Sequence, residues 1–364
     1  MRPTIRLTLL TLLLVGGALG VAACGSSGED TSEATAPSKA ELEKPATGTL
    51  RVFAYDDTVT DEQLDPFREA NPDLDLKIAT FNSNDEAAAK LAGGFEADVV
   101  EVCLDEAKPL LTRNQLRPLD TSGIAAWDKL SFRDEPEVTQ DGNVIMVPLS
   151  AGPYGIAYNT DDIPDGVDSY EQMFGGEYDG RIAIEGGNPV TPLATAALTL
   201  GFDDPFNMTD DQLEQAKQFL IDHQDAIRSY PDSDSDMVNL FKTNEAVVAN
   251  SGRGTALDMI DEGIPVKWVA PEEGTWSWIC GLGITSKAKN IDAAYKLINY
   301  YADPEAQAIS AENGFVITNP DAESLVPAKF KETASPKSIE GSIPLTEPEN
   351  IEAYTKAWQQ VRTG

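Results

Sequence analysis

The sequence predicts an α/β fold of about two domains, and three observations lead to this class. Between residues 50 and 102, short apolar strands alternate with amphipathic helices, which is the pattern that opens a doubly wound parallel sheet. The chain has 364 residues, enough for roughly two domains. Hydrophobic residues make up 41% and charged residues 24% of it, both near the averages of globular proteins.

The opening elements follow from local patterns. An apolar strand at residues 50–54 precedes Thr60 and Gln63, whose spacing predicts a capped helix start. Residues 74–79 alternate apolar and charged side chains, as a half-buried strand does. A helix at 86–91 then leads to a buried strand at 97–102, so the segment reads βαβαβ.

Polar side chains follow two of these strands at the edge where such sheets bind ligands. In open parallel sheets, ligands lie beyond the carboxyl ends of the strands. Tyr55, Asp56 and Asp57 follow the first strand, and Cys103 and Asp105 follow the third. We therefore predict these five residues as candidates for ligand binding.

The stretch from residue 266 to 314 has a definite order of elements. A strand at 266–269 ends in a turn at 271–274, after which Trp276 and Trp278 share one face of an extended segment. Apolar spacing predicts a helix from 291, and Asp303 followed by a proline predicts the start of another. Asn313 and the glycine after it predict that helix's end.

Four motifs in this stretch resemble a known family. They are PEEG at 271–274, WIC at 278–280, AKN at 288–290 and AAYKLIN at 293–299. In these motifs, and over most of residues 48–364, the chain resembles the solute-binding proteins of bacterial ABC importers, most closely the spermidine/putrescine-binding family. That family usually has an amine-binding aspartate where this chain has Cys280.

The resemblance implies a two-lobed periplasmic-binding-protein-like fold. Each lobe would be a mostly parallel sheet with helices on both faces, and a hinge would link the lobes. The first lobe is expected at 49–151 and 280–326. The second is expected at 154–277 and 327–364, with the C-terminal helix packed on it.

The N-terminus has the pattern of an exported lipoprotein. Arg2 and Arg6 precede a largely apolar run at 7–23, which is typical of a signal peptide. VAAC at 21–24 resembles a bacterial lipobox, which implies cleavage and lipidation at Cys24. Small polar residues at 24–48 predict a flexible tether. We expect a lipid-anchored protein on the outer face of the cytoplasmic membrane.

Charge narrows the class of partner. Lys and Arg number 27 against 61 Asp and Glu, a net charge of -34 that disfavours nucleic acid and anionic membrane surfaces. A cationic partner fits this charge better. A purely solubilising role for the excess carboxylates is the alternative.

Cysteine and histidine content bears on cofactors and cross-links. Beyond Cys24, only Cys103 and Cys280 remain, and spacing leaves open whether they form a disulfide or stay as two buried thiols. His223 is the only histidine, so a zinc or haem site is not predicted. No cofactor is expected.

Further candidates come from the second lobe. Tyr154 lies in a predicted turn at 150–155 where the chain crosses between lobes, and Asp234 lies in an aspartate-rich loop at the cleft rim. That loop lacks the glycine and the final acid of a calcium loop, so it is not predicted to bind metal. Glu185 and Thr191 flank a Gly/Asn segment before a helix, and Arg253 stands between two glycines.

The candidate residues point to an amine-bearing solute. Carboxylates would pair with ammonium groups, and Trp276 or Trp278 would give a cation–π contact. Thr191 stands at the family's second-lobe acid, and Arg253 could clamp a carboxylate. A polyamine is therefore the first hypothesis, and a zwitterionic amino acid or aminophosphonate is the second.

The functional hypothesis is a receptor that closes two lobes on its solute and delivers it to an ABC permease, acting as a monomer. An exported hydrolase is disfavoured because no serine motif accompanies His223. A cell-surface signalling or structural lipoprotein that has lost transport is the alternative of another class.

Overall fold

The computed structural model describes residues 35–363. The expected signal peptide at 1–23, the lipidation site Cys24 and the first part of the tether lie outside this range. The strands are β1 Gly48–Ala54, β2 Leu74–Thr80, β3 Val99–Cys103, β4 Thr139–Gln140, β5 Asn143–Val144, β6 Val147–Asn159, β7 Ile182–Ile184, β8 Ile227–Ser229, β9 Val248–Gly252, β10 Val266–Val269, β11 Trp276–Ile284 and β12 Ile343–Pro344. The α-helices are α1 Lys39–Leu42, α2 Asp61–Ala70, α3 Asn84–Ala92, α4 Ala107–Thr112, α5 Tyr170–Met173, α6 Val190–Thr199, α7 Asp210–Asp222, α8 Asp234–Lys242, α9 Arg253–Asp261, α10 Ile291–Tyr301, α11 Pro304–Glu312, α12 Lys331–Ala334 and α13 Ile351–Thr363.

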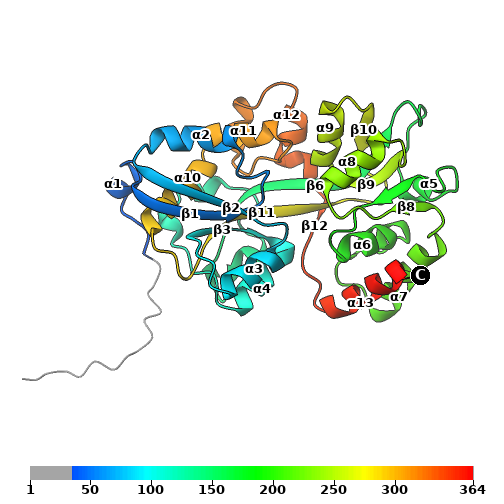
Figure 1. The fold of residues 1–364 in the computed structure, drawn as a ribbon, viewed down its shortest axis with the longest axis horizontal. Helices are drawn as coiled ribbons and strands as arrows, with labels where there is room; N and C mark the ends of the chain where they lie inside the picture. Colours follow the sequence, from blue (N-terminus) through cyan, green and yellow to red (C-terminus); the bar gives the residue numbers. More distant parts are fainter. Residues whose placement is uncertain (1–34, 364) are drawn as a thin grey trace, which may run out of the picture. The chain divides into compact units, whose positions relative to one another are not determined.

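One sheet runs through both lobes in the order β2-β1-β3-β11-β6-β9-β7-β8 (Figure 1). β1 is parallel to β2 and to β3, which confirms the βαβαβ opening. β7 is parallel to β8 and β9 at the other end. The two long strands between these groups, β6 and β11, are antiparallel to each other. β11 is also antiparallel to its neighbour β3, and β6 to its neighbour β9. The α/β class and the two-lobed layout are therefore confirmed.

The chain crosses between the lobes on β6 and β11. The first part of β6 pairs with β11 in the first lobe, and its second part pairs with β9 and β10 in the second. The turn predicted at 150–155 is wrong, because those residues are extended strand. Gly152 explains the error: a Cβ there would lie 2.6 Å from the Trp278 ring, so the glycine serves close packing and not a turn.

Helices cover both faces of each half of the sheet (Figure 1). In the first lobe, α2 and α10 enclose one apolar cluster, and α3 and α4 enclose another on the opposite face. In the second lobe, α6, α7 and α13 bury the largest cluster, and α8 and α9 close the other face. None of the helices within residues 35–363 is both long and apolar enough to cross a membrane.

Helix boundaries follow the predicted capping signals. Thr60 accepts a hydrogen bond from the Gln63 amide at the start of α2. Asp303 caps α11, and Gly314 just after that helix has φ +87°. These local signals were correct because each satisfies orphan backbone groups at a helix end.

The exact lobe boundaries remain a proposal. Ala334 packs in a small cluster beside α11, and Ile339 packs in the cluster beneath α3 and α4. Leu345 packs in the largest cluster of the second lobe. We therefore propose the boundaries given above with one change, in which residues 327–342 go with the first lobe.

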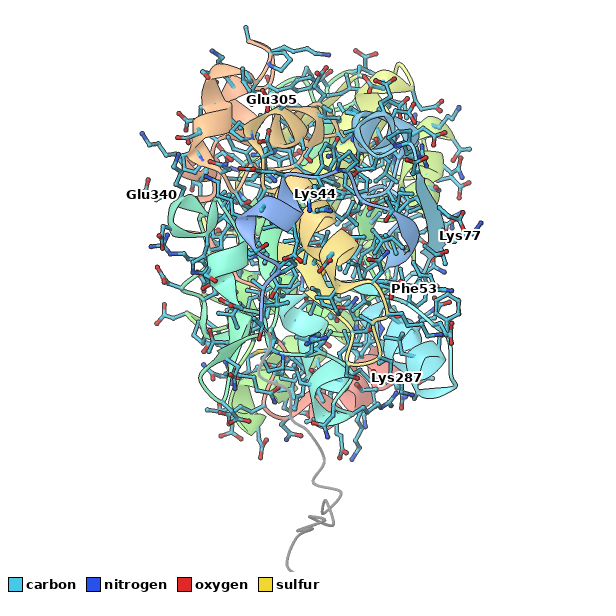
Figure 2. The ribbon with its side chains drawn as sticks, turned by 90° about the vertical axis from the view of Figure 1, so that its left-hand side faces the viewer. Lys44, Phe53, Lys77, Lys287, Glu305 and Glu340 are labelled. Atoms are coloured by element: carbon cyan, nitrogen blue, oxygen red, sulfur yellow. A yellow bond between two sulfur atoms is a disulfide. The ribbon has the colours of Figure 1, made fainter. Side chains whose placement is uncertain are left out.

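Residues 35–48, expected as tether, form an ordered segment at the end of the first lobe. The Ala36 amide donates to Asp120, and Ser38 and Glu41 make a capping box around α1. Ala46 is buried, and its amide donates to Asn71. Figure 2 views this end of the molecule, where Lys44 lies next to α10. Apolar contacts of Ala36 and Leu42 with the α10 cluster account for this docking.

A disulfide joins Cys103 on β3 to Cys280 on β11. The two residues are directly opposite each other in the antiparallel pair, with Cα atoms 4.0 Å apart. The bond closes a loop of sequence separation 177 and ties the crossing strand to the first lobe. It resolves the choice between a bridge and two separate thiols.

Replacing both cysteines with serine should lower the free energy of unfolding by about 2–4 kcal/mol, because the bond restricts the unfolded chain. Urea unfolding followed by tryptophan fluorescence measures this change. The wild-type protein in reductant serves as the matched comparison and should shift in the same direction. An unchanged midpoint in both samples would contradict a stabilising role for the bridge.

Candidate functional site

Carboxylates from both lobes converge on Tyr154 of β6. Its pKa is raised well above the usual range by burial and by the nearby charges of Glu185, Asp234 and Asp105. Asp105 follows β3 in the first lobe, whereas Glu185 follows β7 and Asp234 opens α8 in the second. The structure thus brings together side chains that the sequence placed at separate strand ends.

Asp57 lies in the loop after β1 and faces the same cluster. Its side chain is open to solvent, yet the surrounding protein raises its pKa to about 6 through desolvation and through repulsion by Asp56 and Asp234. We infer a cleft at Asp57, because solvent reaches this carboxyl while protein surrounds it. Asp57 belongs to the first lobe and Asp234 to the second, so this cleft would lie between the lobes.

Glu185 is a second-lobe carboxylate with several polar contacts. Hydrogen bonds from Tyr154, Thr191 and the Gly187 amide stabilise its ionised form, but burial and Asp234 outweigh them and raise its pKa to about 7. Its Oε2 atom is buried and has no hydrogen-bond partner. An unpartnered buried carboxylate oxygen is expensive unless a ligand supplies a donor.

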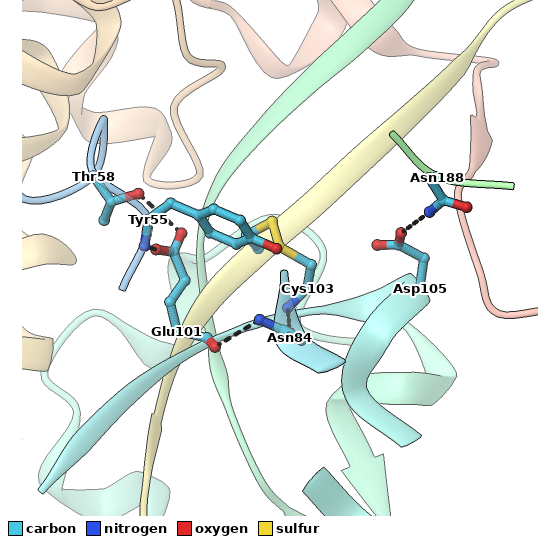
Figure 3. The surroundings of a disulfide bond; sticks show 8 residues. Tyr55, Thr58, Asn84, Glu101, Cys103, Asp105 and Asn188 are labelled. Atoms are coloured by element: carbon cyan, nitrogen blue, oxygen red, sulfur yellow. Dashed lines mark hydrogen bonds between the residues drawn. A yellow bond between two sulfur atoms is a disulfide. The ribbon is translucent and has the colours of Figure 1, made fainter. Parts of the chain in front are cut away.

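The lobes also meet directly at the edge of this cleft. The Asn188 amide donates to Asp105 Oδ2 over 3.4 Å, from the loop before α6 to the loop after β3 (Figure 3). This contact and the shared charges around Tyr154 show that the two lobes line a common site.

Glu101 belongs to the candidate site through its contact with Asp57, although no sequence pattern indicated it. It lies on β3, is 2% exposed, and accepts hydrogen bonds from the Tyr55 amide and the Thr58 hydroxyl (Figure 3). Burial and Asp57 raise its pKa to about 8. The available signal was a glutamate inside the apolar run VVEVC, because charged side chains are rarely buried without a partner.

The aromatic candidates have different positions. Trp276 is fully buried in the second-lobe core and stacks on Tyr154 with ring centroids 5.6 Å apart. Trp278 is half-buried, lies against Gly152 and meets Phe315 edge-on at 5.5 Å. Trp278 therefore remains a candidate for ligand contact, whereas Trp276 is buried and supports the Tyr154 ring.

The disulfide forms part of the first-lobe wall. In Figure 3 the Tyr55 ring lies in front of the Cys103–Cys280 bridge. A disulfide-bonded sulfur carries no charge, so Cys280 supplies no anion at the position where the resemblance implies an aspartate. Any ligand ammonium must therefore find its carboxylates elsewhere in the cluster.

The Arg253 side chain does not act as an anion clamp in this structure. Its guanidinium donates to the Thr333 carbonyl and the Ser338 hydroxyl and lies over the Trp268 ring. Arg253 is 5% exposed, and burial lowers its pKa to about 10. It binds the segment around α12 to α9, and its buried Nε atom has no hydrogen-bond partner, so a ligand contact of Arg253 stays a prediction.

The carboxylate cluster lacks cations. Within residues 35–363, no ion pair includes Asp57, Glu101, Glu185 or Asp234. Desolvation first, and then repulsion between like charges without compensation, raise the pKa values of these groups to about 6 to 8. A positively charged ligand would supply the missing compensation.

Two lobes joined by crossing strands, with polar groups from both lobes around one cleft, define a binding protein that encloses a small solute. A family model described as bacterial extracellular solute-binding protein matches residues 62–336. The chain belongs to this family. The expected class, a solute-binding protein and not an enzyme, is confirmed.

Individual relatives are distant but span the chain. Spermidine/putrescine-binding periplasmic protein 1 of Haemophilus influenzae is 24% identical over 89% of this chain and 88% of its own. The putrescine/agmatine-binding protein of Pseudomonas aeruginosa is 28% identical over 79% and 84%. The spermidine/putrescine ABC transporter substrate-binding protein PotD of Streptococcus pneumoniae superposes with a TM-score of 0.76, at 23% identity over 87% of this chain and 99% of that one.

The free protein should become less stable as the pH rises from about 5 to 8. Glu101 and Glu185 bind protons more tightly when folded than at the ordinary value of 4.5, so folding takes up protons in this range. Their stabilising contribution is complete below pH 4.5 and is lost as the pH passes through about 7 to 8. Thermal unfolding across this range measures the effect.

The Glu101→Gln variant provides the matched comparison for this pH series, because it removes the group with the highest carboxyl pKa of the site. Its melting temperature should fall less steeply between pH 5 and 8. A wild-type melting temperature that rises over the same range would contradict the assigned direction.

Proposed function

We propose that this protein is the receptor of an ABC importer for a polyamine such as spermidine or putrescine. The observation that carries the proposal is the uncompensated carboxylate cluster that both lobes share, with Asp57 on one side and Asp234 and Glu185 on the other. A chain with two or more ammonium groups matches carboxylates on both sides of a cleft. The names of the relatives, which are spermidine-, putrescine- and agmatine-binding proteins, support the same ligand class.

The ligand would lie across the crossing strands between the two lobes. Glu185 Oε2 would accept from one ammonium, since it is buried without a partner. Asp57 and Asp56 would hold charge from the first lobe, and the half-buried Trp278 would contact the alkyl chain or an ammonium. Rotation about β6 and β11 would open and close the lobes.

A zwitterionic ligand has less support. It would need a cation in the cleft for its acidic group, and the candidate for that role was Arg253. That guanidinium is committed to Thr333 and Ser338. The net charge of -34 and the cluster itself both favour a ligand with positive charge only.

Export and anchoring complete the proposal. The signal-like residues 1–23 and the lipobox resemblance at Cys24 support a lipid-anchored protein on the outer face of the cytoplasmic membrane. The ordered segment at 35–48 would carry the anchor's attachment to the first lobe, near α10. The cognate permease would receive the solute from the closed protein, and we propose a monomer as the working form.

Calorimetry at pH 7.5 should detect binding of spermidine and putrescine and no binding of glutamate, glycine or aminomethylphosphonate. Asp57→Asn and Asp234→Asn, one change in each lobe, should each weaken polyamine binding by about tenfold or more, because each removes a partner of a buried ammonium.

The control for these variants is Asp211→Asn, which makes the same charge change on the exposed surface of α7. Its affinity for polyamines should equal that of the wild type. Heat from a zwitterion with none from either polyamine would overturn the polyamine proposal.

A further inference from the structure

A small cavity lies in the first lobe beside the ligand cleft. Its volume is about 10 Å³, and Thr58, Glu101, Ser310, Tyr301 and Phe315 contribute to its lining. Thr58 belongs to the same loop as Asp57, and Phe315 packs edge-on against Trp278. The cavity therefore lies next to the loop of Asp57 and to a residue that contacts Trp278.

We infer that this cavity is a subsite for one primary ammonium group of the ligand, with the Glu101 carboxylate as its counter-ion. The inference rests on the proposed function and assigns one end of the ligand to a residue that sequence patterns did not indicate. Under this inference, Glu101 replaces the negative charge of the aspartate that the resemblance implies at Cys280. The carboxylate now comes from β3, two residues before the bridged Cys103.

Hydrogen-bond directions around the cavity favour a group that only donates. The Thr58 hydroxyl donates to Glu101, the Tyr301 hydroxyl donates to the Thr58 carbonyl, and the Ser310 hydroxyl donates to Gln63 Oε1. These three hydroxyl protons are thus used and their oxygen lone pairs remain, while the Ser150 hydroxyl also lines the cavity and can accept as well. A primary ammonium has three donors and no acceptor, which matches this lining.

The size of the cavity limits which cations fit. A volume near 10 Å³ is about that of a single water-sized group. A primary ammonium has that size, whereas a trimethylammonium group is several times larger. Aromatic contacts such as Trp278 accept quaternary ammonium readily, so they would not impose this limit. Selectivity for an unmethylated amine would therefore report on the cavity.

The charges around Glu101 are consistent with a cationic occupant. Asp57 from the loop after β1 adds negative charge, and Tyr301 of α10 and Tyr55 are neutral neighbours. Residues 35–363 place no Lys or Arg in an ion pair with Glu101. Without a ligand, its raised pKa keeps the group largely protonated at neutral pH. An ammonium in the cavity would stabilise the ionised form.

Glu101 also supports the Tyr55–Thr58 loop, so a loss of affinity alone would not separate the two roles. Ligand selectivity does separate them. The experiment compares putrescine with its bis(trimethylammonium) analogue by calorimetry at pH 7.5. The wild type should prefer putrescine by at least about 30-fold, the lower end of effects for buried charge pairs.

Two variants test the assignment to this cavity. Glu101→Gln removes the charge, and Ser310→Thr keeps the hydroxyl and the Glu101 charge but places a methyl group in the cavity. Both should lose most of the preference for putrescine. Glu137→Gln removes a half-buried carboxylate of the same lobe outside the site and should keep the wild-type preference.

The outcomes distinguish this inference from the proposed function. If wild-type protein binds neither polyamine, the proposed function fails. If wild-type protein binds putrescine and the preference is absent, or persists in both Glu101→Gln and Ser310→Thr, the subsite assignment is overturned. In that case Glu101 serves only to hold the loop.

Discussion

Desolvation of neighbouring acidic side chains, together with their mutual repulsion, is the constraint on which the rest of the site depends. Asp57, Glu101 and Glu185 keep pKa values near 6, 8 and 7 because each is desolvated and faces another acid. Carboxylates that serve only solubility would be expected on the outer surface, where they stay hydrated. The contacts of these three acids with one another and with Asp234 join acids of both lobes, and this arrangement supports the proposed cationic ligand.

The crossing strands make this arrangement possible. β6 and β11 belong to both lobes, so the residues on them lie at the floor of the cleft while loops from each lobe form the walls. The disulfide fixes β11 to β3 at the point where the first-lobe wall begins. Gly152 allows the Trp278 ring to pack closely against β6. Rotation about two strands can then change the separation of the walls without disturbing the floor.

The sequence predicted what depends on local physics and missed what depends on distant contacts. The predicted caps at Thr60 and Asp303 and the βαβαβ order were correct, because hydrogen bonding and periodicity act over a few residues. The predicted turn at 150–155 was wrong because Gly152 is needed for close packing against the Trp278 ring on another strand. The contacts of Arg253 with Thr333 and Ser338 could not be predicted, since these acceptors lie 80 or more residues away. Glu101 was overlooked because its role comes from the fold and not from a motif.

The number of protons exchanged on binding tests the central claim most directly. Calorimetric titration of spermidine at pH 7 in two buffers of different ionisation enthalpy gives this number. If a cation compensates the shared carboxylates, binding must ionise groups that the free protein holds partly protonated, so protons should be released. Binding without proton release, or with uptake, would contradict the account.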